Sequence, residues 1–165
     1  MLDVNDIIND IMKEVVGGKT IVVYGGRFQP FHPGHAGVYR HLVKKFGKEN
    51  VFIATSNKTD NVKSPFNFRE KKEIITKMFN IPSNKVVEVR SPYVPKEILR
   101  NFDKNKDSLV VAVSKKDSDR LKGGKYFREY NPSSILIPFE KAGYYYVTPM
   151  FGKSISGTEV RDLLG

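Results

Sequence analysis

Two histidines and an arginine stand among glycines near the start of this 165-residue chain, in a segment whose residue types are suited to binding phosphate. The segment covers residues 25–35, Gly-Gly-Arg-Phe-Gln-Pro-Phe-His-Pro-Gly-His, and its polar members include Arg27, His32 and His35. An apolar run precedes it and a helical pattern over 35–46 follows it, so it joins a predicted strand to a predicted helix. Free N–H groups at a helix start favour a bound anion, and two histidines three residues apart can both contact the same bound group. The segment therefore predicts a phosphate site.

The glycines of this segment fit that interpretation better than a metal site. Gly26 and Gly34 let a ligand approach the main chain closely, although a glycine pair at a strand end is often only a turn. A metal site would need ligands at regular helical spacing, which Pro33 interrupts. The chain supplies one other histidine, His41, and no cysteine. We therefore predict no protein-bound metal.

The rest of the chain alternates apolar runs with helical patterns. The predicted strands lie at 51–56, 85–90, 108–114 and 133–139, and the predicted helices at 35–46, 67–79 and 95–102. Such alternation predicts an α/β fold with a mostly parallel sheet covered on both faces, which is a three-layer sandwich. Ligands bind such sheets at the carboxyl ends of the strands where the strand order reverses, which is where the first strand would place His32 and His35.

Local signals mark two helix starts and two loops. Asn67 with Glu70, and Ser156 with Glu159, each fit a capping box, in which side chains satisfy the first free N–H groups of a helix. The polar stretches predicted to be mobile are 57–65 and 115–125.

The first residues differ in character from the remainder. Residues 1–18 predict an N-terminal amphipathic helix, which packs on the domain or makes a subunit contact, and residues 19–165 predict one further domain. The sequence leaves open whether the protein forms a homo-oligomer. The apolar positions at helical spacing are Leu2, Ile7, Ile8, Ile11, Met12 and Val15.

Composition limits the classes of partner. The formal net charge of +10 invites a nucleic-acid interpretation, but the cations are mixed with acidic residues, and small polyphosphate substrates explain the surplus equally well. Specific nucleic-acid binding is not expected. No apolar run is long enough to cross a membrane and the chain start lacks the features of a secretory signal, so no membrane partner is expected. The absence of cysteine fits a reducing compartment, and we expect a cytoplasmic protein.

Two motifs in this order resemble a known enzyme family. Residues 27–35 look like the GRFQPFHxGH signature of nucleotidyltransferases related to nicotinamide mononucleotide adenylyltransferase. Residues 154–161, Ser-Ile-Ser-Gly-Thr-Glu-Val-Arg, look like their second signature, ISxTxxR. Between them, Lys58 and the stretch 64–71 are similar to the family's NPFxxxER segment. The resemblance covers most of the chain from residue 20 onward and implies a Rossmann-like fold.

The implied reaction moves a nucleoside monophosphate from a triphosphate to a phosphorylated acceptor and releases pyrophosphate. The second pKa of a phosphate monoester is about 6, so the acceptor is largely ionised at neutral pH and no general base is required. The protein must instead orient the reactants and neutralise the charge that develops on phosphoryl oxygens. Magnesium is expected to arrive with the triphosphate, because Mg²⁺ keeps its waters and seldom needs a protein cage.

The motifs assign roles by resemblance. The catalytic residues are predicted to be His32, His35 and Arg161, with His35 nearer the α-phosphate. The predicted nucleotide- and phosphate-binding residues are Gly25, Gly26, Arg27, Phe28, Gly34, Ser156, Thr158, Lys58, Lys71 and Arg120.

Two departures from the family pattern bear on the substrates. The arginine of NPFxxxER falls on Lys71, with Arg69 two positions earlier, so the identity of the mid-chain phosphate cation is open. Relatives that act on nicotinamide mononucleotide place an acidic residue and a tryptophan after the third strand, whereas this chain has Val-Arg-Ser-Pro-Tyr at 89–93 and no tryptophan. Tyr93 is the predicted acceptor-binding residue, and a loop aromatic that anchors the turn is the alternative.

Three functions follow from these observations. The favoured one is an adenylyltransferase that makes NAD from ATP and nicotinamide mononucleotide. A cytidylyltransferase that uses CTP and a phosphorylated alcohol keeps the class but changes the substrates. A protein that binds nucleotides or nucleic acid without catalysis belongs to a different class, and the intact His32, His35 and Arg161 argue against it.

Overall fold

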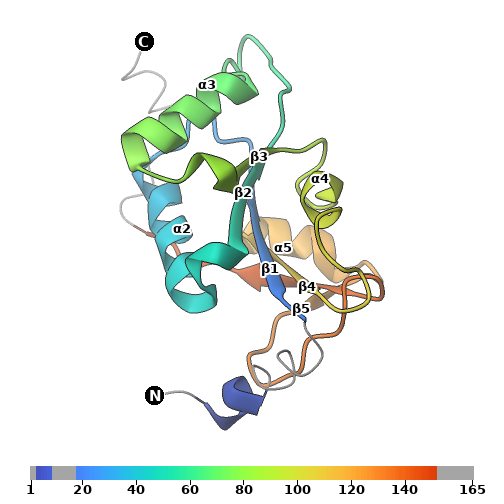
Figure 1. The fold of residues 1–165 in the computed structure, drawn as a ribbon. Coiled ribbons are helices and arrows are strands. Elements are labelled where there is room, and N and C mark those ends of the chain that lie inside the picture. The colour runs from blue at the N-terminus through green and yellow to red at the C-terminus, as the bar shows by residue number, and fades with distance from the viewer. Residues whose placement is uncertain (1–2, 9–17, 152–165) are drawn as a thin grey trace.

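A six-stranded parallel sheet forms the centre of the computed structural model, which describes residues 3–8 and 18–151 (Figure 1). The strand order is β3-β2-β1-β4-β6-β5, and every neighbouring pair is parallel. The strands are β1 (Thr20–Gly25), β2 (Val51–Thr55), β3 (Val86–Glu88), β4 (Ser108–Val113), β5 (Phe127–Glu129) and β6 (Gly143–Val147). The order reverses between β1 and β4, as in Rossmann-like folds, so the predicted fold class is confirmed.

Helices cover both faces of the sheet and make two hydrophobic cores. The helices are α2 (Pro33–Phe46), α3 (Phe68–Glu73), α4 (Lys96–Leu99) and α5 (Lys115–Lys122), with short helical segments η1 (Lys48–Asn50), η2 (Ile74–Met78) and η3 (Ser83–Lys85). Figure 1 shows α2 and α3 on one face and α4 and α5 on the other. Alternate residues of β1 supply the two cores: Val22 packs with Leu42 of α2, and Val23 packs with Ile98 of α4. Because both faces are covered, β4 is buried along its whole length.

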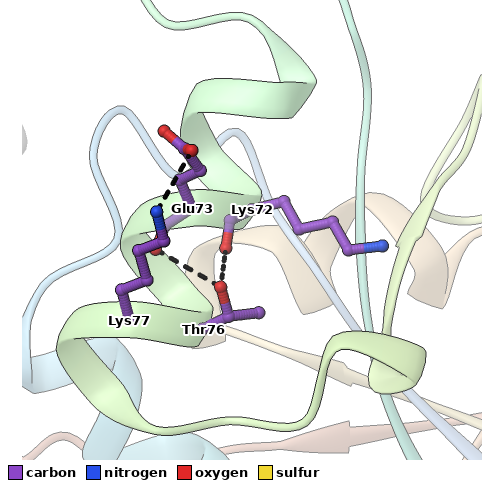
Figure 2. Close-up of polar contacts among 4 residues, drawn as sticks. All are labelled: Lys72, Glu73, Thr76 and Lys77. Carbon is purple, nitrogen blue, oxygen red and sulfur yellow. Dashed lines mark hydrogen bonds and ion pairs between the residues drawn. The ribbon is translucent and has the colours of Figure 1, made fainter.

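The predicted helix over 67–79 forms, although its second half is a π-helical turn, η2. The side-chain oxygen of Asn67 accepts a hydrogen bond from the Glu70 N–H, and the Glu70 carboxylate accepts one from the Asn67 N–H. The predicted capping box is therefore confirmed. On the outer surface, the Thr76 hydroxyl donates to the Lys72 carbonyl at 2.8 Å (Figure 2). The side chains of residues 73 and 77 form an exposed ion pair at 3.4 Å in the same view.

Two predictions about the second half of the chain were wrong. The apolar run at 133–139 is not a strand: Pro132 and Pro138 lack a backbone N–H, and the Ile137 N–H donates to the Tyr144 hydroxyl rather than to a neighbouring strand. The strands of this region are instead β5 and β6. Most of the stretch 115–125, predicted to be mobile, is helix α5, which begins where the Ser114 hydroxyl accepts the Asp117 N–H.

Only part of the predicted N-terminal helix lies within the described residues. Residues 4–8 are helical, and Val4, Ile7 and Ile8 are exposed there. The predicted boundary between 1–18 and 19–165 therefore stays a prediction. None of the helices described here is long and apolar enough to span a membrane.

Candidate functional site

A cleft of about 1030 Å³ opens at the carboxyl ends of the four strands β1 to β4. This is the edge of the sheet at which ligands bind in such folds, beside the point where the strand order reverses, and the volume is that of a small-molecule site. The sequence-predicted residues that line the cleft are Gly25, Gly26, Arg27, Phe28, His32, His35, Lys58, Tyr93 and Arg120. The second predicted motif, with Ser156, Thr158 and Arg161, lies outside the described residues.

The two motif histidines stack on each other at the start of α2. Their ring centroids are 3.7 Å apart with 21° between the planes. His32 is the N-cap residue, and its Nδ1 accepts the Gly34 N–H at 3.1 Å; Nδ1 of His35 accepts the His32 N–H at 3.1 Å. These bonds assign the proton of each neutral ring to Nε2. Both histidines therefore offer an Nε2–H donor, and both rings line the cleft.

Aromatic side chains surround His35 on its inner side. The rings of Phe28 and Phe31 lie 5.0 and 5.3 Å from the His35 ring, and the Tyr24 ring lies 6.4 Å away. Burial among them lowers the pKa of His35 to about 3, with a smaller contribution from the charge of His32. Burial also lowers the pKa of His32. Both side chains are hence neutral hydrogen-bond donors at neutral pH rather than cations.

The lowered pKa of His35 predicts that the chain loses stability on acidification. Between pH 6.5 and about 3 the unfolded chain protonates this histidine while the folded chain does not, so the free energy of unfolding falls as the pH decreases through that window. The slope should approach about 1.4 kcal/mol per pH unit for this one group. Urea denaturation at several pH values measures it. The same series on His35→Asn should show a flatter dependence, and an unchanged slope would contradict the assignment.

Close packing around the glycines shapes the mouth of the cleft. A Cβ on Gly34 would lie 2.9 Å from Cε1 of His32, and one on Gly25 would overlap Cβ of Pro92. Real Cβ atoms do not approach other atoms so closely. Gly34 does not itself line the cleft; its N–H and its missing side chain hold the His32 ring in place.

Cations dominate the charged lining of the cleft. Arg27, Lys58 and Arg120, which the sequence predicted, are joined by Lys63, Arg90 and Lys116, which it did not. Asp117 is the acidic residue among the lining residues, and it pairs with Arg120 at 3.7 Å. The three missed cations follow β2, β3 and β4, so only the strand order could have identified them. Such a surface suits a ligand with several phosphate groups.

The structure places the mid-chain cation away from the described lining of the cleft. Lys71 was predicted to bind phosphate, but it is 1% exposed and does not line the cleft. Its Nζ donates to the Arg27 carbonyl at 3.2 Å, the Thr55 hydroxyl at 2.8 Å and the Ser56 carbonyl at 2.5 Å. Arg69 is exposed and also does not line the cleft. Neither Lys71 nor Arg69 therefore lies on the described lining of the cleft, and the identity of the mid-chain phosphate cation stays a prediction.

Tyr93 lines the cleft from the loop that follows β3. Its side chain is half-buried and hydrogen-bonded to Asp117, and burial together with that carboxylate raises the pKa of the phenol. Arg120 pairs with the same carboxylate. The bond to Asp117 therefore links the Tyr93 side chain, at the end of the loop 90–93, to helix α5.

The described residues include no cluster of three or more histidine, aspartate or glutamate side chains able to hold a metal ion. The only carboxylate on the described lining of the cleft is already engaged by Arg120. This donor set does not fit a dedicated magnesium site, since Mg²⁺ prefers free carboxylate oxygens.

Comparison with known proteins agrees with this geometry. Residues 23–163 match the sequence profile described as cytidylyltransferase-like. The chain belongs to this family. Within it, the chain is 25% identical over 149 residues to the nicotinamide-nucleotide adenylyltransferase of Sulfurisphaera tokodaii, covering 86% of this chain and 77% of that protein. It is 26% identical over 142 residues to the enzyme of the same name from Methanocorpusculum labreanum, covering 84% and 76%.

Solved structures share the fold. A bifunctional NMN adenylyltransferase/ADP ribose pyrophosphatase from Francisella tularensis superposes with a TM-score of 0.56 at 25% identity over 88% of this chain, which spans 42% of that protein. Another structure of the Francisella tularensis protein contains AMP and a manganese ion. The Plasmodium falciparum nicotinic acid mononucleotide adenylyltransferase, complexed with NaAD, matches with a TM-score of 0.53 at 17% identity, covering 88% and 84%. The family and its members place this chain among the nucleotidyltransferases, as the motifs predicted.

Proposed function

We propose that this nucleotidyltransferase transfers the AMP group of ATP to the phosphate of nicotinamide mononucleotide, forming NAD and pyrophosphate. The observation that supports it most strongly is the pair of stacked histidines whose Nε2–H groups line a cationic cleft at the switch point of the sheet. The names of the relatives from Sulfurisphaera tokodaii and Methanocorpusculum labreanum favour this substrate pair.

The reaction needs positioning and charge stabilisation. An oxygen of the acceptor phosphate attacks the α-phosphorus of ATP, a new P–O bond forms, and the bond from the α-phosphorus to the bridging oxygen breaks as pyrophosphate leaves. We assign the Nε2–H groups of His35 and His32 to the oxygens of the transferring phosphoryl group, where negative charge grows. Arg27 and, in the second motif, Ser156, Thr158 and Arg161 are assigned to the departing pyrophosphate.

Magnesium would supply charge neutralisation on the triphosphate oxygens when it enters with ATP. The Francisella tularensis relative with AMP and manganese supports the use of a divalent ion in this family. Because the described cleft offers no free carboxylate cluster, we derive no step from a protein-held metal.

A second candidate is transfer of CMP from CTP to a phosphorylated alcohol. The lack of any tryptophan in the chain favours it, because the resemblance implies a tryptophan after the third strand in relatives that act on nicotinamide mononucleotide, and this chain has Tyr93 in that segment.

The substrates are tested by incubating the protein with Mg²⁺, one nucleoside triphosphate at a time and one acceptor at a time, and measuring pyrophosphate release. Release with ATP and nicotinamide mononucleotide alone supports the proposal. Release only with CTP and a phosphorylated alcohol favours the second candidate. Binding without release from any combination would indicate the non-catalytic alternative.

The acceptor assignment predicts the behaviour of Tyr93→Ala. Stacking of a base on an aromatic ring is worth roughly 1 to 3 kcal/mol, so the KM for nicotinamide mononucleotide should rise about tenfold or more while the KM for ATP stays the same. Tyr93→Phe is the matched control, because it keeps the ring and removes only the hydrogen bond to Asp117. Equal KM increases in both variants would mean that the hydroxyl, and not stacking, matters.

A further inference from the structure

The start of α3 and the residues just before it are tied to the loops that follow β1 and β2, and both loops line the cleft. The Gln29 side-chain amide donates to the Phe66 carbonyl at 2.7 Å, and its carbonyl oxygen accepts the Phe66 N–H at 2.8 Å. The Asn57 side-chain oxygen accepts the Phe68 N–H at 2.9 Å. Gln29 follows β1 and Asn57 follows β2, so two separate loops are held by one helix start.

Lys71 completes these links one turn further along. Its ammonium group contacts both chain segments at once: the Arg27 carbonyl in the loop after β1, and the Thr55 hydroxyl and Ser56 carbonyl at the end of β2. The Thr55 hydroxyl is also within 3.3 Å of the Arg27 carbonyl, so it donates there while it accepts from Lys71. All three protons of the ammonium therefore have acceptors at the carboxyl ends of β1 and β2.

A buried lysine at this place costs stability. Burial lowers the pKa of Lys71 to about 8, although the nearby Glu88 carboxylate favours the protonated form. An apolar side chain would fill the same position beneath the sheet edge without that cost. A buried charge that is present despite this cost in stability is typical of a functional site.

We propose that Lys71 is a positioning residue that joins the carboxyl ends of β1 and β2 and thereby fixes Arg27 at the rim of the cleft. The Arg27 backbone is held from below by the ammonium group, while its side chain lines the cleft above. Its effect on ligand binding rests on the proposed function, in which this end of the cleft receives the triphosphate.

The test compares Lys71→Met and Lys71→Arg with Lys77→Met as the matched control. Lys77 lies on η2, which continues α3, but its side chain is 76% exposed and pairs with Glu73 on the outer surface (Figure 2). Calorimetry should show that Lys71→Met weakens MgATP binding about tenfold to a hundredfold, since misplacement of a binding group by about 1 Å can have effects of this size. Lys71→Arg, which keeps the charge, should recover part of the affinity, and Lys77→Met should bind as the unmodified protein does.

Kinetics and hydrogen exchange separate this role from a merely structural one. In Lys71→Met the KM for ATP should rise far more than the KM for the acceptor, and exchange of the backbone amides should speed up at 26–29 and 56–58 but not in β4. A folded Lys71→Met protein with normal ATP affinity and unchanged exchange in both loops would overturn the proposal. If the unmodified protein binds no ATP, the proposed function fails, and the exchange measurement still decides the role of Lys71. If Lys71→Met does not fold, Lys71→Arg carries the same exchange comparison.

Discussion

His35→Ala is expected to lower kcat by about a hundredfold to a thousandfold, which is typical of losing one preorganised donor to a developing oxyanion. The residue can act only as a donor, because its Nδ1 is engaged by the His32 N–H and its neutral ring holds the proton on Nε2. The KM for ATP should change much less, since the cationic lining of the cleft persists. Steady-state kinetics with both substrates varied measures the two constants.

His41→Ala is the control for this prediction. His41 also lies on α2, but its Nε2 pairs with the Tyr146 hydroxyl at 2.7 Å and it does not line the cleft. Its removal should leave kcat within a few-fold of the unmodified value. A fully active His35→Ala enzyme would remove His35 from the mechanism.

Gly34→Ala is expected to reduce kcat by about tenfold to a hundredfold without loss of the fold. The new Cβ would lie 2.9 Å from Cε1 of His32, so the His32 ring must turn away. The ring then loses its hydrogen bond from the Gly34 N–H and its stacking on the His35 ring. A displacement of about 1 Å at a reacting centre can cost two orders of magnitude. Alanine is itself a good helix former, so α2 should persist.

Gly123→Ala is the matched control for that substitution. No heavy atom lies within 4 Å of a Cβ built at Gly123, which ends α5. Circular dichroism confirms folding of both variants, and kcat then distinguishes them. If Gly34→Ala turns over as fast as Gly123→Ala, the position of the His32 ring has no role in the reaction.

The sequence predicted the fold and the first half of the site because both depend on local signals. The apolar run of β4 and the Asn67 capping box are short-range patterns, and the structure contains both. The segment from Gly25 to His35 is contiguous, so its position at a strand end was readable directly. The strand expected at 133–139 failed because prolines at both ends of that run remove backbone donors, which outweighs its apolar character.

The features that the sequence did not show depend on contacts between distant segments. Lys63 and Lys116 reach the cleft only because β2 and β4 flank β1, and no local pattern encodes that order. Lys71 matched a phosphate-binding position in the motif, yet the path of its side chain beneath the loops is set by α3 packing on the sheet. Motif register identified the residue, and tertiary structure determined what its ammonium group contacts.

The fate of the phosphorus atoms of ATP tests the central claim most directly. The protein is incubated with Mg²⁺, nicotinamide mononucleotide and ATP labelled with ³²P at either the α- or the γ-phosphate, and the products are separated by chromatography. Attack at the α-phosphorus predicts that the α label appears in NAD and the γ label in pyrophosphate, with both signals reduced about a hundredfold or more in His35→Ala. Release of the γ label as inorganic phosphate, or an α label that stays in ATP in the unmodified protein, would contradict adenylyl transfer by this chain.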